Sequence, residues 1–302
     1  MEYHRVLPSR ITLALLALFA SLAAAPVSYE QEVAAWHRER IAELKRDDGW
    51  LTLVGLFWLD EGENRFGSGA GNKVIFPEGS APALAGTFER HGKEVRVHAA
   101  PGAALTHDGQ PVTDLVLTSG DDSARPVQLA LGSLRFFIIR RGDRVGVRVK
   151  DTKSPVLAAF KDVDTYPVRK AWRFDARFEP YNPPKPVAVP NVLGQVENSP
   201  SPGAVVFEKD GRTYRLDAIG QDKDGSLFFV FGDPTNGHET YGAGRFLDTA
   251  APKDGKVVVD FNKAYNPPCA FTAFATCPLP PKDNKLAVRV EAGEKKFGEG
   301  HH

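Results

Sequence analysis

The sequence lacks an excess of charge of either sign. Lys and Arg together number 38, as do Asp and Glu. Removing the first 25 residues would take away Arg5, Arg10 and Glu2 and leave the remainder within about one charge of neutrality. A protein that binds the phosphate backbone of a nucleic acid, or an anionic membrane surface, usually carries a clear basic surplus. The composition therefore gives no reason to expect nucleic acid as a partner.

Motifs that mark common enzyme classes are also missing. The chain contains no nucleophile elbow, phosphate-binding loop, dinucleotide fingerprint or histidine-glutamate zinc pattern. These absences exclude the usual nucleotide-binding and serine-hydrolase routes, and no cofactor or metal is expected. They leave open a catalytic site assembled from scattered strand ends, so the sequence does not decide whether the protein is an enzyme. Internal repeats and low-complexity tracts are absent as well.

Cysteine is scarce, since Cys269 and Cys277 are the only two in the chain. In an oxidising compartment, two thiols eight positions apart are expected to form a disulfide that closes a small loop. Such a loop would contribute about 2 to 3 kcal/mol by chain entropy. Zinc is the alternative, but the spacing matches no common ligand pattern and two further ligands would be needed.

The first 25 residues have the parts of a secretory signal peptide. Basic residues precede an uncharged run from Ile11 to Ala25, which ends in Ser-Leu-Ala-Ala-Ala before Pro26. An uncleaved anchor is the alternative, but a membrane span needs about 20 apolar residues. We therefore expect an exported protein, periplasmic or secreted, with cleavage after Ala23 or Ala25 and no membrane span afterwards. No cysteine follows the apolar run, so a lipoprotein is not expected.

The mature chain is expected to be mostly β. Tyr29 to Arg46 is the one convincing amphipathic helix, and from Trp50 onward short apolar runs alternate with Gly, Pro, Asn and Asp. This pattern favours an antiparallel sandwich or barrel. Gly142 and Asp143 predict a tight hairpin, whose arginines at 140, 141 and 144 we interpret as an exposed charged turn. The other strands expected in this block are 51–59, 73–76, 94–98 and 114–117.

Proline-rich segments predict a division into two packed β subdomains. Residues 178–186 and 198–203 are so rich in proline that we expect surface connections rather than strands. The first subdomain would be 26–178, with the helix and a β-sandwich. The second would be 179–302, with strands at 204–207, 212–218, 226–231, 256–261 and 286–290.

Part of the first block resembles forkhead-associated sandwiches. The resemblance lies in the strand and turn rhythm of residues 61–68, 72–77 and 108–112. In that family the position after the glycine of the first motif is a phosphate-binding arginine, whereas this chain has Ser68. The resemblance therefore implies the sandwich shape and not phosphothreonine binding.

The segment from Gly232 to Leu247 concentrates polar residues between glycines. His238 could act as a general base with Glu239 or Asp233 as carboxylate partner. Neighbouring residues on a strand point to opposite faces, so His238 and Glu239 could cooperate only within a turn. A solvated turn histidine is the alternative interpretation.

Ligand-binding candidates follow in the same part of the chain. If 240–247 were a strand, Tyr241 and Arg245 would share a face, and Arg245 could clamp a carboxylate or phosphate. A structural ion pair of Arg245 with Asp260 or Glu294 is the alternative. Asparagine and tyrosine side chains suited to a polar ligand follow, although Asn also simply forms turns: Asn262, Tyr265, Asn266 and Asn284. Glu294 is the last candidate of this ligand-binding set.

The same segments resemble a family known as domain of unknown function 1684. The resemblance is carried by residues 235–247, 260–271 and 277–281 and by Ala292-Gly293-Glu294-Lys295, and it extends from about Glu32 to Lys295. It implies one continuous unit and lends no activity.

Three functions are consistent with the sequence. The first is a binding module for a small polar or anionic molecule, held by the C-terminal polar residues. The second is a hydrolase in which His238 and a carboxylate activate water. The third is a structural or partner-binding sandwich without a small-molecule site.

Overall fold

The computed structural model describes residues 27–119 and 126–298, and it is mostly β, as expected. The expected signal peptide lies outside the described residues. Helix α1 (Tyr29–Leu44) begins at Ser28, whose hydroxyl accepts from the Gln31 N–H while the Gln31 side chain accepts from the Ser28 N–H. This capping box fixes where the helix starts. No helix within the described ranges is long and apolar enough to cross a membrane.

Two sheets form a sandwich in the N-terminal half. The first sheet has the order β1-β11-β10-β9-β6-β7 and the second β3-β2-β4-β5-β8. Their inner faces enclose one apolar cluster in which the rings of Phe66, Phe88 and Phe136 pack together. The strand bounds are β1 (Leu53–Trp58), β2 (Gly62–Gly67), β3 (Val74–Ile75), β4 (Gly86–His91), β5 (Glu94–Ala99), β6 (Thr106–His107), β7 (Gln110–Pro111), β8 (Asp114–Leu117), β9 (Leu129–Leu131), β10 (Leu134–Arg141) and β11 (Arg144–Asp151).

Two further sheets build the C-terminal half. One has the order β14-β13-β12-β18 and the other β15-β16-β17, and a second apolar cluster centred on Phe261 lies between them. The bounds are β12 (Arg173–Pro190), β13 (Val196–Lys209), β14 (Arg212–Asp217), β15 (Gly220–Gln221), β16 (Leu227–Phe231), β17 (Arg245–Thr249) and β18 (Lys256–Asp260).

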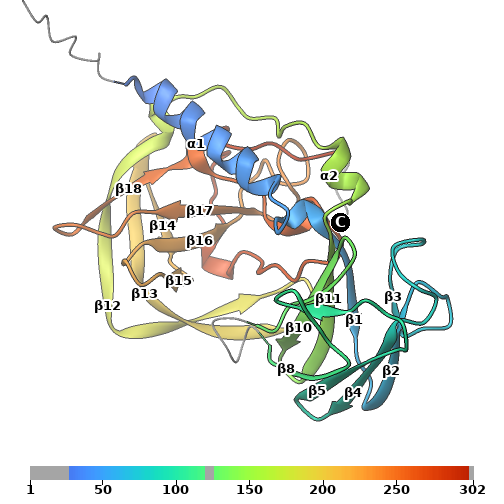
Figure 1. The fold of residues 1–302 in the computed structure, drawn as a ribbon. Helices are drawn as coiled ribbons and strands as arrows, with labels where there is room; N and C mark the ends of the chain where they lie inside the picture. Colours follow the sequence, from blue (N-terminus) through green and yellow to red (C-terminus); the bar gives the residue numbers. More distant parts are fainter. Residues whose placement is uncertain (1–26, 120–125, 299–302) are drawn as a thin grey trace, which may run out of the picture.

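A third apolar cluster joins the halves. It brings Leu53 of β1 together with Val189 of β12, Val230 of β16 and both cysteines. In Figure 1, α1 lies across β16 and β17, the N-terminal sandwich is at the lower right, and the long strands β12 and β13 curve around the opposite side. The connecting elements are α2 (Pro155–Ala159) and the short 3-10 turns η1 (Trp50–Thr52), η2 (Lys170–Trp172), η3 (Phe261–Lys263), η4 (Pro268–Ala270) and η5 (Lys282–Asn284).

The proline-rich segments are not surface connections, which corrects the expectation from the sequence. Both belong to the paired strands β12 and β13. The register shifts between Pro180 and Lys185, so the densest prolines fall at an irregularity of the ladder. Pro186 and Pro200 stand opposite each other, which antiparallel pairing tolerates because alternate residue pairs exchange no hydrogen bonds.

The expected strand at 286–290 is also absent. Its backbone bonds to other partners: the Val290 N–H donates to the Asp233 carboxylate, and the Val290 carbonyl accepts from Arg245. A side-chain pair thus replaces the neighbouring strand. The proposed boundary at 178/179 between two subdomains stays a prediction.

Candidate functional site

The charged centre of the polar segment is a fully enclosed ion pair. The Arg245 guanidinium lies 3.1 Å from the Asp233 carboxylate, and the side chains of both residues have no exposed surface. Arg245 also donates to the carbonyls of Ala292, Val290 and Glu294, and its guanidinium carbon lies 5.2 Å from the centre of the Phe231 ring. This corrects the expectation of a ligand clamp: Arg245 is in an ion pair, and its carboxylate is Asp233 rather than Asp260 or Glu294.

Asp233 has several partners besides Arg245. It accepts from the backbone N–H of Thr235, from the Thr235 hydroxyl and from the Val290 N–H. A carboxylate saturated by donors in this way holds a turn together and has no lone pair directed at solvent. The sequence Asp-Pro-Thr-Asn-Gly after β16 therefore folds around its first residue.

The hydrolase candidates do not converge. His238 is exposed in the turn at 235–240, and Glu239 is held by two contacts of 2.7 and 2.8 Å to the Arg289 guanidinium. Among the described residues no hydrogen bond links His238 to Glu239 or Asp233. Without a carboxylate to orient the imidazole, the dyad needed for water activation is not formed.

Three of the predicted ligand-binding residues link distant backbone segments. Asn284 is completely buried and exchanges 2.8 Å hydrogen bonds with the backbone of Asp217 at the end of β14, besides donating to Val230. Asn262 similarly joins the backbone at Arg169, and Asn266 donates to the Lys295 carbonyl. In Asn284 and Asn262 both the donor and the acceptor of the amide are used, as expected of buried structural supports, whereas the described residues offer no partner for the Asn266 side-chain oxygen.

Glu294 and Tyr241 are buried too. Glu294 accepts from the Asn266 N–H at 2.7 Å and contacts Arg40 at 3.4 Å, and burial raises the pKa of its carboxyl. Tyr241 precedes β17 instead of lying in it, so it does not share a strand face with Arg245. The residue is 2% exposed and lies beside the cysteines, and burial raises the pKa of its phenol.

The two cysteines are free and buried, which corrects the predicted disulfide. Each backbone N–H donates to the sulfur of the other residue, at 3.2 and 3.4 Å. The loop between them is therefore held by paired hydrogen bonds in place of a covalent link. Within the described ranges, no three or more His, Cys, Asp or Glu side chains are grouped so that they could hold a metal ion.

The polar segment does border a cavity of about 450 Å³, but mainly with backbone and apolar groups. Much of its wall is formed by two leucines and by prolines 190, 234 and 280. The polar atoms of Asp233 and Asn236 form hydrogen bonds within the protein. Lys285 is the one cationic side chain in this lining. The cavity thus offers few groups for a polar ligand.

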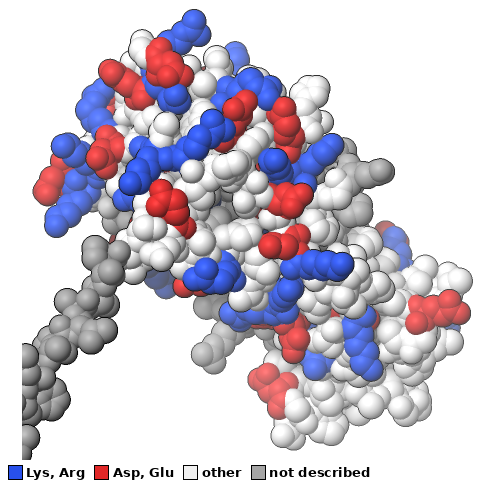
Figure 2. Space-filling view, turned by 90° about the horizontal axis from the view of Figure 1, so that it is seen from above, with Lys and Arg blue, Asp and Glu red and all other residues white. Residues whose placement is uncertain are grey.

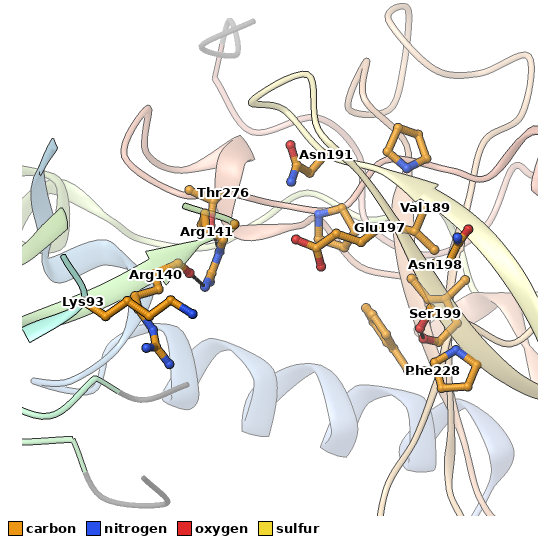
Figure 3. Close-up of a pocket in the computed structure, with 15 residues that line it drawn as sticks. Lys93, Arg140, Arg141, Val189, Asn191, Glu197, Asn198, Ser199, Phe228 and Thr276 are labelled. Carbon is orange, nitrogen blue, oxygen red and sulfur yellow. Dashed lines mark hydrogen bonds between the residues drawn. The ribbon is translucent and has the colours of Figure 1, made fainter. Parts of the chain in front are cut away.

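A larger cleft of about 710 Å³ opens between the N-terminal sandwich and the C-terminal sheets. Its basic side combines Lys93, from the turn between β4 and β5, with Arg140 and Arg141 from the end of β10. Gly142 has a φ of 58° and closes the two-residue turn after them. Figure 3 shows the three cationic side chains on one side of the cleft.

The opposite side of the cleft is both polar and apolar. Val189 lies near the end of β12, Asn191 directly follows that strand, and Glu197, Asn198 and Ser199 lie along β13 (Figure 3). The Ser199 hydroxyl donates to the Ile219 carbonyl at 2.6 Å, which fixes that strand edge. The remaining lining residues are Gly142, Pro190, Pro200, Ile219, Phe228, Thr276 and Pro278.

Hydrogen bonds across the cleft fix the position of its basic side. The Nε of Arg141 donates to the Thr276 hydroxyl at 3.0 Å, and Arg148 of β11 reaches the same oxygen at 3.4 Å. From the other side, the Gln195 amide donates to the Arg141 carbonyl at 3.3 Å. The cleft is therefore a joint between the halves whose shape is set by bonds on both sides.

Nothing local in the sequence identified this cleft. Its residues come from positions 93, 140–142, 189–200, 219, 228 and 276–278, which only tertiary packing brings together. The arginines were recognised as a charged turn, and that turn is part of the site. The outer surface as a whole carries no comparable signal: on the face shown in Figure 2, basic and acidic side chains alternate without a broad field of one sign.

Comparison with known proteins found similarity to one family model and to several solved structures. No curated protein matches the sequence. A solved structure of an uncharacterised Haloarcula marismortui protein is 29% identical, with a TM-score of 0.39 over 46% of this chain and 78% of that one.

Two solved structures of FHA domains are also similar. The FHA domain of FhaA, in a complex with an intracellular domain of another protein, is 16% identical with a TM-score of 0.23, over 32% of this chain and 97% of that one. A structure from work on phosphothreonine-dependent FHA domain interactions is 17% identical with a TM-score of 0.23, over 33% of this chain and 96% of that one. The family resemblance expected from the sequence is confirmed over residues 158–295, which match the model described as protein of unknown function, DUF1684.

Proposed function

We propose that the protein binds a small organic anion in the cleft between its two halves. The observation that carries this proposal is the convergence of Lys93, Arg140 and Arg141 on one side of a 710 Å³ cavity. Binding sites for small molecules commonly have 300 to 1,000 Å³, mostly apolar walls and a few polar groups that fix orientation. Val189, Ile219 and Phe228 supply the apolar wall here.

The charge distribution favours an anionic group at the basic end. An arginine presents a planar set of N–H donors that matches a carboxylate or phosphate, and Lys93 adds a point charge beside it. Glu197, on the facing strand, would repel a ligand whose charge extended across the whole cleft. The ligand class that fits is a molecule with one anionic end and an apolar body.

The test is a thermal-shift and calorimetric titration with benzoate, phenyl phosphate and inorganic phosphate. A ligand that binds only the folded state raises the melting temperature by mass action. Replacing Arg140 and Arg141 together by alanine should weaken binding of the best ligand at least tenfold, because charge-assisted hydrogen bonds contribute about 1.5 to 3 kcal/mol. Arg38→Ala, at an exposed position of α1 outside this lining, is the matched control. Unchanged affinity in the double variant, or no shift with any anion, would reject the proposal.

We further propose that the protein is exported and loses its first 23 to 25 residues. The support is the sequence pattern of basic residues, an apolar run and small residues before Pro26. Expression of the full chain in a secreting bacterial host, followed by intact-mass measurement of the extracytoplasmic fraction, tests this. A protein that keeps Met1 contradicts it.

A further inference from the structure

One face of α1 and one face of the small sheet β15-β16-β17 line the same cavity. Trp36, Glu39, Arg40 and Glu43 are spaced by three, one and three residues, which places them on the same side of the helix. All four line a third cavity, of about 580 Å³. The helix therefore presents an indole and three charged side chains to this space, and Figure 1 shows α1 crossing β16 and β17.

The sheet contributes the other wall. Phe228 of β16 stands opposite Asp248 of β17, and Phe246 lies two residues before Asp248. Residues that are paired across strands, or two apart along one strand, point to the same face. Tyr265 pairs with Phe246 through an isolated bridge, and their rings meet edge to face at 5.8 Å.

The cavity is thus walled by aromatic rings and rimmed by carboxylates. Five of its lining residues are aromatic and three are acidic, against one arginine. The side-chain carboxylates of Glu39 and Glu43 have no hydrogen-bond or ion-pair partner among residues 27–119 and 126–298. The full lining is Trp36, Glu39, Arg40, Glu43, Trp50, Phe228, Phe246, Asp248, Tyr265 and Pro268.

The arginine in this cavity is already engaged by the protein. Arg40 donates to the Asn266 carbonyl at 3.0 Å and contacts the Glu294 carboxylate at 3.4 Å. Its guanidinium carbon lies 4.6 Å from the centre of the Tyr265 ring. The protein itself therefore already places a cation against an aromatic wall of the cavity.

Asp248 is an exposed residue of the acidic wall. Its carboxylate accepts a 2.7 Å hydrogen bond from the Tyr265 hydroxyl, which fixes its position against the sheet. Partial burial raises the pKa of this carboxyl, although the residue keeps exposed surface.

We propose that this cavity is a binding site for an organic cation of the quaternary ammonium type, with the cation against Trp36 and Phe228 and near the carboxylates of Asp248 and Glu43. The proposal does not depend on the function proposed for the basic cleft, with which this cavity shares only Phe228. Aromatic walls attract ammonium groups through the negative face of each ring, and Trp is the most effective ring. Carboxylates at the rim add long-range attraction.

An organic cation fits these walls better than a metal ion does. Metal ions need several ligands at short distance, and within the described part of the chain no three or more His, Cys, Asp or Glu side chains lie together in that way. A methylated ammonium needs no such ligands, because it is weakly hydrated and makes contact through its methyl surface. The volume also exceeds what a single ion would occupy.

The test compares choline with 3,3-dimethylbutan-1-ol, which has the same shape without the charge. We expect choline to bind saturably in calorimetry and to change tryptophan fluorescence, while the neutral analogue binds at least fivefold more weakly, since a desolvated cation–π contact contributes about that factor or more. Equal binding of the two compounds, or no saturable binding of choline, overturns the proposal.

Variants locate the site. Asp248→Asn keeps an acceptor for the Tyr265 hydroxyl and should weaken choline binding about fivefold. Trp36→Phe should remove most of the fluorescence change, whereas Trp58→Phe, in the N-terminal sandwich, should retain it. The Arg140/Arg141 double variant should bind choline like the parent, which separates this proposal from the proposed anion site. If neither Asp248→Asn nor Trp36→Phe changes choline binding, choline binds at another site and the proposal is rejected.

Discussion

Two groups of arginines in this protein carry the same charge and have different surroundings. Arg245 is fully enclosed, paired with Asp233 and bonded to three carbonyl groups. Arg140 and Arg141 are half-buried at the mouth of a cleft. The first arginine holds the C-terminal segment to β17, whereas the other two face a space that a ligand can enter. Whether an arginine can bind a ligand is therefore indicated better by its exposure to solvent than by the number of polar groups around it.

The largest expected effect follows from removing the enclosed charge. Arg245→Ala leaves the Asp233 carboxylate buried without its cation, which should lower the free energy of unfolding by about 3 to 5 kcal/mol. Urea denaturation followed by circular dichroism measures this. If the variant does not fold, Arg245→Lys is the second measurement, and it should be less destabilised because it keeps the charge. If the free energy of unfolding of either the alanine or the lysine variant lies within about 1 kcal/mol of the parent value, the structural role is contradicted.

A smaller loss of stability is expected when the buried, uncharged side chain of Asn284 is removed. Asn284→Ala removes three hydrogen bonds to the backbone of Asp217 and Val230 and leaves buried groups without partners. We expect a loss of about 2 to 3 kcal/mol. Asn198→Ala, at an exposed position of β13, is the matched control and should change stability by less than about 0.5 kcal/mol. If both substitutions lowered the free energy of unfolding equally, Asn284 would be no more important for the fold than an exposed residue of the cleft.

Glu294 should make stability depend on pH. Burial raises its pKa above the ordinary value of 4.5, so the folded state holds the proton more tightly than the unfolded state. Stability from this group is complete below 4.5 and falls as pH rises toward the raised folded pKa. Relative to Glu294→Gln, the parent should therefore lose stability on going upward from pH 4.5. A difference between parent and variant that is constant between pH 4 and 8 would contradict this.

The smallest effect on stability is expected at the cleft. Arg141→Ala removes a 3.0 Å hydrogen bond to Thr276 from a half-buried side chain and should cost about 1 kcal/mol or less. The same denaturation experiment measures it, beside Arg245→Ala. A loss as large as that of Arg245→Ala would show that Arg141 also serves mainly to support the fold.

Local patterns were sufficient to predict part of this molecule. The hairpin of β10 and β11 follows from Gly142, Asp143 and the β-forming flanks, and α1 follows from apolar spacing, although it ends at Leu44 rather than Arg46. The prediction failed where two strands tolerate proline together, as Pro186 and Pro200 do, because the partner strand is not visible in a local window.

The candidate site was less predictable for the same reason. Asp233, Arg245 and Asn284 are polar residues in a glycine-rich context, which resembles an exposed loop, but each finds its partners within the protein. The cleft residues gave little signal because Lys93, Arg140 and Phe228 are far apart in sequence and meet only after the two halves pack.

Phe228 lines both the basic cleft and the aromatic cavity under α1. One ring is thus shared by two spaces of opposite charge. A ligand that turns this ring in one space alters the wall of the other, and the two binding equilibria are then thermodynamically linked. Linkage is reciprocal: whatever factor the cation contributes to the affinity for the anion, the anion contributes to the affinity for the cation. If both proposed ligands bind, Phe228 is the residue through which the two sites can be coupled.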